Sequence, residues 1–329
     1  MSRPSIVIVT PALADANNGN WRTARRWAAM LRPRFDVRLV SDWQGGDEAL
    51  MIALHARRSA AAATAWRKAH PSRPLLLALT GTDLYRDIDC DASARHSLAI
   101  ADRLITLNTL GARALPSALR ARCSVLLQST PARARVAPPT RHLRALMIGH
   151  LRAEKAPDTL FDAVRRLRTR TDIRIDHIGG ALDPALGEQA RTLMRECPHY
   201  RWLGGLTHGD TLRRLARASV LVHPSRMEGG AHTVIEAVRC GVPVIASRID
   251  GNVGLLGKDY DGCFEAGDAA ALAACIGRAR DDAGWLVRLE RQCAARAPLF
   301  APERERAALV ALVDGCLASF GPRHGVATA

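Results

Sequence analysis

The sequence has no apolar stretch long enough to cross a bilayer. Its longest apolar runs, such as Leu75 to Leu79, end well before the ~20 residues that a membrane-spanning helix needs. Its first apolar run, Ser5 to Val9, is too short for a secretory signal, and no small-residue cleavage site follows it. We therefore expect a cytoplasmic protein with no membrane partner.

The eight cysteines include no Cys-x-x-Cys pair and no histidine partner at the spacing of a zinc site, so they are expected to be reduced and mostly buried. Lysine is scarce as well. Because the only lysines are Lys68, Lys155 and Lys258, the net charge of +15 comes almost entirely from arginine. A basic chain suits nucleic acid, a membrane surface or an anionic small molecule. The arginines are spread along the chain without an aromatic and basic RNA motif, which favours small-molecule partners over nucleic acid.

The chain has 329 residues, of which 48% are hydrophobic, and this length suits two domains. Short apolar runs alternate with helical patterns from end to end, which is typical of parallel sheets with crossover helices. Strands are expected at Ser5 to Thr10, Val37 to Val40, Leu50 to Leu54, Leu75 to Thr80, Leu104 to Leu107, Val125 to Gln128, Ala145 to Ile148, Ile173 to Ile178, Arg201 to Leu203, Val220 to His223 and Val244 to Ser247.

The prolines and alternating Ala and Arg residues of Pro131 to Thr140 predict a linker, because prolines end helices and the alternation offers no buried face. The predicted fold is therefore α/β, with two Rossmann-like, doubly wound parallel-sheet domains at residues 1–135 and 136–305. Residues 306–329 are expected to be a C-terminal helix that packs back on the first domain, followed by a tail. Closure of the two domains about the linker is also expected.

The segment from Val220 to Ser247 carries the most informative pattern. Glu228 and Glu236 stand seven residues apart, with Gly229 and Gly230 between them at a predicted helix start. The free N–H groups of a helix start bind an anion, and a carboxylate farther along is placed to accept hydrogen bonds from ribose hydroxyls. The alternative makes Glu228 a complement to the helix dipole and Glu236 a solvated residue. The surrounding Pro-Ser, Gly-Gly and Gly-Val-Pro favour the ligand site.

This segment resembles the nucleotide-sugar site of retaining GT-B glycosyltransferases of family 4. The segment from Met147 to Ala163 is similar to that family's Gly-Arg-Leu and Lys-Gly motif, with Lys155 matching and His150 standing where arginine is usual. The resemblance implies two domains facing across a cleft and a metal-independent transfer, and no Asp-x-Asp pair stands at a predicted strand end. It assigns catalysis to Lys155, Arg152, His150 and Glu228, and donor binding to Gly149, Gly229, Gly230, Ala231, His232, Thr233 and Glu236.

Polar and basic residues also follow three predicted strands of the first half, at the sheet edge where acceptors bind in this architecture. We expect them to form a cationic acceptor site. The alternatives are a helix N-cap at Asn18 or Asn20 and a structural role for His55. The candidate acceptor residues are Asn18, Gly19, Asn20, Arg25, His55, Arg57, Thr80, Thr82 and Asp83.

Taken together, the loops Ala-Asn-Asn-Gly-Asn-Trp, Leu-His-Ala-Arg-Arg-Ser and Thr-Gly-Thr-Asp-Leu-Tyr-Arg, with the motifs of the second half, are similar to the selenosugar synthases of selenoneine biosynthesis. That resemblance implies an enzyme that joins selenophosphate to the anomeric carbon of UDP-N-acetylglucosamine or UDP-glucose. It implies no cofactor, and a functional link to a downstream selenoneine-forming enzyme.

Three other functions stay open from the sequence. An ordinary O-glycosyltransferase would use Asp83 or His55 as a base toward a hydroxyl acceptor. A nucleic-acid-binding protein would use the positive charge, and would bind duplexes in a salt-dependent way. A catalytically inactive scaffold is the last alternative, and the presence of Lys155, Glu228 and Glu236 argues against it.

Overall fold

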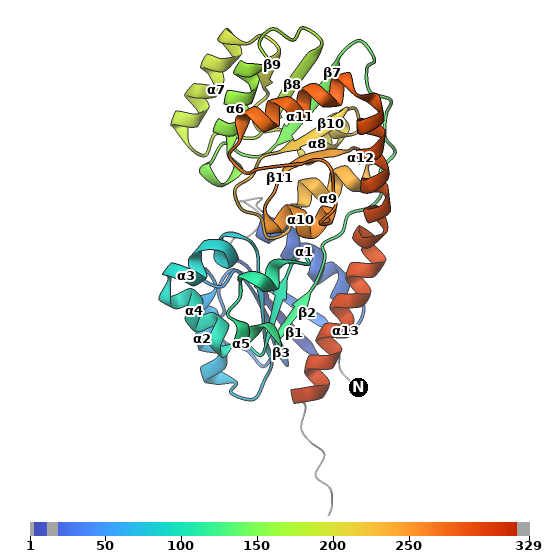
Figure 1. Ribbon diagram of the computed structural model, residues 1–329. Helices are drawn as coiled ribbons and strands as arrows, with labels where there is room; N and C mark the ends of the chain where they lie inside the picture. Colours follow the sequence, from blue (N-terminus) through green and yellow to red (C-terminus); the bar gives the residue numbers. More distant parts are fainter. Residues whose placement is uncertain (1–2, 12–18, 321–329) are drawn as a thin grey trace, which may run out of the picture. The chain divides into compact units, whose positions relative to one another are not determined.

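A computed structural model of the protein describes residues 3–11 and 19–320. The chain divides into two compact units, the first formed by the chain up to Gln128 and from Pro302 onward, and the second by Ser129–Ala301. Each unit contains one six-stranded parallel sheet with helices around it (Figure 1). The predicted α/β class with two doubly wound sheets is confirmed. The unit boundaries lie at 128/129 and 301/302, compared with the predicted 135/136 and 305/306.

The first unit has the strand order β2-β1-β3-β4-β5-β6, with every neighbouring pair parallel. Its strands are β1 (Ser5–Val9), β2 (Asp36–Val40), β3 (Leu50–Leu54), β4 (Leu75–Leu79), β5 (Arg103–Thr106) and β6 (Cys123–Val125). Its helices are α1 (Gly19–Leu31), the π-helical turn η2 (Asp83–Asp87), α2 (Ala60–Ala69), α3 (Ile88–Cys90), α4 (Ala92–Ile100), the 3-10 turn η3 (Gly111–Ala114), α5 (Ser117–Arg120) and α13 (Pro302–Phe320).

Both faces of this sheet are covered. Successive residues of a strand point to opposite faces, so Ile6 and Ile8 lie in one core cluster while Val7 and Val9 lie in another. The first cluster packs against α1 and α13, and the second against α2 and α4. Every residue of β3 and β4 is buried, as expected for central strands of a parallel sheet.

Helix α13 comes from the far end of the sequence and completes the first unit, where it lies beside α1 (Figure 1). Its Leu309, Val313 and Cys316 are buried in the core cluster on that face of the sheet. Glu305 is also buried on α13, and its carboxylate accepts hydrogen bonds from Arg26 at 2.9 and 3.1 Å and from Trp27 Nε1 at 2.7 Å. The fold of the first unit therefore depends on both ends of the chain.

The second unit has the strand order β12-β11-β10-β7-β8-β9, also parallel throughout. Its strands are β7 (Leu143–Ile148), β8 (Ile173–Ile178), β9 (Tyr200–Trp202), β10 (Val220–His223), β11 (Val244–Ser247) and β12 (Cys263–Phe264). Its helices are η4 (Ala153–Lys155), α6 (Pro157–Arg166), α7 (Pro184–Glu196), α8 (His208–Leu215), α9 (His232–Arg239), α10 (Asp250–Leu256), α11 (Ala269–Asp281), α12 (Ala283–Arg296) and η5 (Ala297–Phe300).

Each sheet has a point where the strand order reverses. In the first unit it lies between β1 and β3, and in the second between β7 and β10. Ligands of open parallel sheets bind beyond the carboxyl ends of the strands at such a point. A ligand-binding site is therefore expected at the loop after β3 in the first unit and at the loops after β7 and β10 in the second.

Most expected strands are found, with two differences. Val125 to Gln128 was expected as a strand, but the ladder ends at Val125; Leu126 is buried, and the buried Gln128 instead donates from Nε2 to Thr23 Oγ1 at 2.6 Å. The two-residue edge strand β12 was not predicted at all. None of the helices among the described residues has the length and apolar character needed to cross a membrane.

Candidate active site

Lys155 and Glu228 meet at the reversal point of the second sheet. Lys155 ends the turn η4 after β7, Glu228 lies in the loop between β10 and α9, and Lys155 Nζ donates to Glu228 Oε1 at 2.5 Å. His223, the last residue of β10, places Nε2 at 3.2 Å from the same oxygen. Burial works to raise the pKa of the Glu228 carboxyl, but the Lys155 charge and the His223 hydrogen bond together hold that pKa well below its usual range. Glu228 is thus a carboxylate fixed by two donors.

The loop that carries Glu228 is held from two sides. Arg226 donates from its backbone N–H to Glu154 O at 2.9 Å and from its guanidinium to Ala153 O at 2.8 Å, which ties the loop to η4. On the other side α10 packs so closely that a Cβ at Gly251 would lie 2.0 Å from the Glu228 carbonyl oxygen. Only glycine fits there, and the carboxylate position follows from this backbone packing.

The other cations predicted after β7 lie differently. His150 Nδ1 accepts a hydrogen bond from Gly180 N at 3.0 Å, so the ring joins the loop after β7 to the loop after β8. This contact fixes the ring between the two loops, and the catalytic role expected for His150 stays a prediction. Arg152 is exposed at 44% of its side chain and lies 3.9 Å from Glu154.

Two buried residues that were given no role from the sequence support Gly149. His177 Nε2 lies 3.0 Å from Gly149 O and its Nδ1 lies 3.0 Å from Tyr200 Oη. Burial lowers the pKa of His177 to about 4, so the ring is neutral; Nε2–H donates to the Gly149 carbonyl and the Tyr200 hydroxyl donates to Nδ1. Gly179 lies against the same carbonyl, because a Cβ there would come within 1.9 Å of Gly149 O.

Helix α9 begins just after the two glycines. Its N-cap residue Ala231 makes no side-chain cap hydrogen bond, and Thr233 Oγ1 lies 3.4 Å from His223 Nδ1. The first backbone N–H groups of a helix lack intrahelical partners and favour an anion. The predicted donor residues Gly229, Gly230, Ala231, His232 and Thr233 therefore form one continuous helix entrance next to Glu228.

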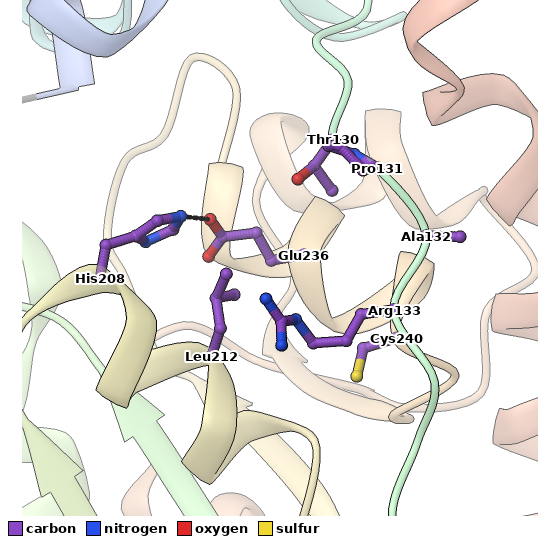
Figure 2. Close-up of a pocket in the computed structure, with 8 residues that line it drawn as sticks. All are labelled: Thr130, Pro131, Ala132, Arg133, His208, Leu212, Glu236 and Cys240. Atoms are coloured by element: carbon purple, nitrogen blue, oxygen red, sulfur yellow. Dashed lines mark ion pairs between the residues drawn. The ribbon is translucent and has the colours of Figure 1, made fainter.

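Glu236 lies one turn into α9 and is almost fully buried, with 3% of its side chain exposed. Its Oε1 lies 3.5 Å from His232 Nε2 on the same helix and 3.6 Å from His208 Nε2 at the start of α8. Figure 2 shows His208 and Glu236 facing each other at a cavity of about 410 Å³. The residues lining this cavity are Thr130, Pro131, Ala132, Arg133, His208, Leu212, Glu236 and Cys240.

The side chain of Arg133 runs from the predicted linker into this cavity beside Leu212 (Figure 2). The carboxylate of Glu236 accepts hydrogen bonds, and Arg133 and His208 offer nitrogen donors across the space. The chemistry of the lining thus suits a polar ligand with hydroxyl groups. Neither Arg133 nor His208 was predicted as a site residue, because their contribution depends on how α8 and the linker pack against α9.

In the first unit, the loops after β3 and β4 form one cluster around His55. This residue has a left-handed backbone with φ of 74°, and its Nε2 lies 3.1 Å from Thr82 Oγ1. Arg58 N lies 3.4 Å from Nδ1, which makes Nδ1 the acceptor and leaves Nε2–H to donate to Thr82. Burial lowers the pKa of His55, so the ring is neutral at pH 7. Backbone strain at a non-glycine residue and a π-helical turn such as η2 both concentrate at functional sites.

Asp83 holds this cluster together. It is fully buried; Oδ1 accepts from the N–H groups of Thr80 and Gly81 at 2.8 Å each, and Oδ2 accepts from Ala56 N at 2.9 Å. Asp83 therefore positions the loops after β3 and β4. Both ring nitrogens of His55 are engaged as well, Nδ1 with Arg58 N and Nε2 with Thr82 Oγ1. A role of either residue as a base toward a hydroxyl acceptor stays a prediction.

Guanidinium groups surround the His55 cluster. Arg57 Nε donates to Asp87 Oδ2 at 2.8 Å and Arg86 Nε donates to Asp87 Oδ1 at 3.0 Å. Both arginines keep 40% or more of their side chains exposed. This part of the predicted acceptor site is cationic and open to solvent.

Three of the residues expected at the acceptor site lie on α1. Gly19 begins the helix, Asn20 follows it, and Arg25 is exposed farther along. Asn18 lies outside the described residues. Within residues 3–11 and 19–320, no group of three His, Cys, Asp or Glu side chains is arranged to hold a metal ion.

The sequence profile of the family described as "Glycosyl transferases group 1" matches residues 129–298. The chain belongs to this family. The match covers the whole of the second unit up to η5, including Lys155, Glu228 and Glu236.

Curated relatives of this glycosyltransferase chain include the D-inositol 3-phosphate glycosyltransferase of Salinispora arenicola, which is 28% identical over 215 residues, 58% of this chain and 45% of the relative. The protein of the same name from Streptomyces bingchenggensis is 31% identical over 188 residues, 54% of this chain and 41% of the relative. The aligned part of the chain thus spans less than half the length of these relatives.

Two solved structures share the fold. Sucrose-phosphate synthase from Thermosynechococcus elongatus superposes with a TM-score of 0.76 at 16% identity, covering 97% of this chain and 100% of that one. Anabaena HepE, solved in complex with UDP and glucose, has a TM-score of 0.77 at 14% identity and covers 95% and 100%. At these identities the likeness shows the GT-B fold alone.

Proposed function

We propose that this glycosyltransferase transfers a sugar from a UDP-sugar to selenophosphate. The proposal that the protein binds a UDP-sugar donor rests on one cluster of side chains. Lys155 and His223 both contact the Glu228 carboxylate where β7 and β10 end. A donor diphosphate placed against the start of α9 would take the Lys155 ammonium as a partner. Arg152, exposed on the neighbouring turn, would add a second cation.

The chemistry follows from where charge develops. As the bond between the anomeric carbon and the diphosphate oxygen breaks, its electron pair leaves with UDP, and the enzyme must stabilise that negative charge. Lys155 and the N–H groups at the start of α9 supply this stabilisation in the proposal, with no metal ion required. Both fixing donors of Glu228 reach Oε1, so Oε2 is the atom placed to accept a hydrogen bond from a sugar hydroxyl.

The nucleoside half of the donor is assigned to the cavity at Glu236. A ribose offers two neighbouring hydroxyl groups as donors, and the Glu236 carboxylate accepts hydrogen bonds. His208 Nε2 and His232 Nε2, from two helices, lie 3.6 and 3.5 Å from its Oε1. Anabaena HepE, a protein of the same fold, was solved in complex with UDP and glucose, which supports a nucleotide ligand for this chain.

Selenophosphate is assigned to the first unit. What supports this is the cluster of His55, Thr82, Arg57 and Arg86, which suits a small phosphoryl anion, and the acceptor-side motifs. The curated relatives are named for D-inositol 3-phosphate, which is also a phosphorylated small molecule. The selenium lone pair forms the bond to the anomeric carbon as UDP leaves. Water then attacks phosphorus, the Se–P bond breaks, and the products are a 1-selenosugar and phosphate.

One observation favours a second acceptor class. The curated relatives are named D-inositol 3-phosphate glycosyltransferases, so a phosphorylated small molecule with hydroxyl groups is the alternative acceptor. Transfer to a hydroxyl group of a phosphorylated acceptor would use the same cationic loops. We prefer selenophosphate as the acceptor because it is already deprotonated near neutral pH and therefore needs no base to remove a proton.

The test is a competition of acceptors. Purified protein is incubated with UDP-N-acetylglucosamine or UDP-glucose in buffer containing EDTA, with either selenophosphate or inositol 3-phosphate as acceptor. We expect UDP release and a selenium-containing sugar by mass spectrometry in the first reaction only. UDP release with inositol 3-phosphate alone would replace selenophosphate by a hydroxyl acceptor, and no release with any donor would contradict the transferase assignment.

A further inference from the structure

The second unit contains another cavity, separate from the one at Glu236. It has a volume of about 300 Å³, in the size range of small-molecule pockets, and shares no lining residue with the first cavity. The buried Leu146 of β7 contributes apolar surface. The lining residues are Arg144, Leu146, Asp176, Asp210, Arg213, Arg214 and Arg217.

Internal ion pairs account for only part of the charge around this cavity. Arg213 pairs with Asp210, and the buried Asp176 lies 3.8 Å from Arg214 and 2.8 Å from Arg201. The guanidinium groups of Arg144 and Arg217 make no hydrogen bond or ion pair with any residue that the structure describes. Four arginines thus face two carboxylates, and two of the four are left to bind something else.

The side chains favour phosphate over other anions. Guanidinium groups present planar pairs of N–H donors that match phosphate oxygens, and the cavity has arginine at every basic position. Arg144 comes from β7, while Arg213, Arg214 and Arg217 come from α8 and the residues just after it, so donors converge from two elements. The cavity is too large for a single chloride and has the volume for a diphosphate or a small phosphorylated molecule.

We propose that this cavity, lined by Arg144 and Arg217, is a second anion site of the glycosyltransferase, with a diphosphate or a small phosphorylated metabolite as its ligand. Its place on α8 separates it from the proposed donor site. His208 begins α8 and faces Glu236, whereas Arg213, Arg214 and Arg217 lie at the other end of that helix and beyond it. The two sites can therefore be filled at the same time.

The experiment is a calorimetric titration of the full-length protein with inorganic pyrophosphate in the presence of saturating UDP, which occupies the donor site. We expect one further equivalent of pyrophosphate to bind. Replacing one guanidinium in Arg217→Ala or Arg144→Gln should weaken this binding about tenfold or more, the usual effect of losing a charged hydrogen-bond donor. Arg291→Ala is the matched control, because Arg291 is exposed on α12, carries the same charge and does not line the cavity.

Each result decides the proposal. No binding above saturating UDP, or equal weakening in Arg217→Ala and Arg291→Ala, would overturn it, the latter because general surface charge would then explain the binding. Circular dichroism shows whether each variant is folded, and Arg217 is exposed, so its substitution leaves the core intact. Failure of the proposed UDP site can be told apart from failure of the second anion site. Pyrophosphate binding that depends on Arg217 would persist even in a protein that does not bind UDP.

Discussion

At the scale of single residues, the candidate active site depends on one carboxylate, that of Glu228, which two other side chains contact. Lys155 is one of three lysines in the chain, and its ammonium contacts a carboxylate that His223 also holds. In the proposed function, a bound diphosphate would give Lys155 a second negatively charged partner beside Glu228.

Lys155→Ala should lower kcat about a hundredfold, which corresponds to the ~3 kcal/mol typical of one donor to developing negative charge. Steady-state UDP release measures the effect. Lys258→Ala is the control, because Lys258 is an exposed lysine of the same unit. A normal kcat in Lys155→Ala, or an equal loss in the control, would remove Lys155 from the reaction.

The Glu228 carboxylate also makes stability depend on pH. Its pKa in the folded protein lies below the ordinary glutamate value, so its contribution to stability is full above that ordinary value and is lost as the pH falls. We expect the melting temperature of the wild type to fall more steeply than that of Glu228→Gln between about pH 6 and pH 3. Parallel curves for the two proteins would contradict the ion-paired state of Glu228.

At the scale of elements, the conformation of the loop after β7 depends on contacts with the neighbouring strand β8 and the loop after it. The Gly149 carbonyl is held by His177 and packed against Gly179, and both residues come from β8 and its loop. The loop predicted to bind the donor is therefore positioned by a strand that contributes no predicted donor contact. The buried polar side chains behind it come from two strands, His177 from β8 and Tyr200 from β9.

Gly179→Ala tests that arrangement. The added Cβ would collide with the Gly149 backbone, which should cost about 1–3 kcal/mol in stability and weaken UDP binding. Gly180→Ala is a close control, because a Cβ there would meet only His150 Nδ1 at 3.6 Å, an ordinary contact. Thermal unfolding and UDP titration of both variants provide the readout. Tolerance of alanine at both positions would show that the loop is not fixed in this way.

The elements also show what could be predicted from the sequence. Strand positions followed from apolar runs such as Leu75 to Leu79, because central parallel strands are buried on both faces. Leu126 and Gln128 misled the prediction, since they are buried by side-chain packing outside the ladder. Glu228 and Glu236 were visible as a local motif, but Arg133 and His208 were not, because tertiary packing alone brings them to the cavity.

At the scale of the whole molecule, the order of segments matters. The chain builds most of the first unit, then the second, and returns at Pro302 to complete the first with α13. Glu305 is the polar anchor of that return, as a fully buried side chain with donors from Arg26 and Trp27. The stability of the first unit is thus tied to the last helix.

Glu305→Ala should destabilise the first unit by ~3 kcal/mol, because it leaves the Arg26 charge and the Trp27 indole N–H without their partner. Urea unfolding checks the size of the effect. UDP affinity should not change, since the proposed donor residues belong to the other unit. Glu303→Ala, on the exposed first turn of α13, is the control and should be neutral. Equal stability of the two variants would contradict the anchoring role.

We propose that the second unit binds the nucleoside diphosphate of the donor through Lys155, the start of α9 and Glu236. Calorimetric titration of the full-length protein with UDP tests this binding. We expect binding at one site, weakened about tenfold or more in Glu236→Ala and in Lys155→Ala but not in Lys258→Ala. No heat of binding to the folded wild type, or the same affinity in all three variants, would contradict it.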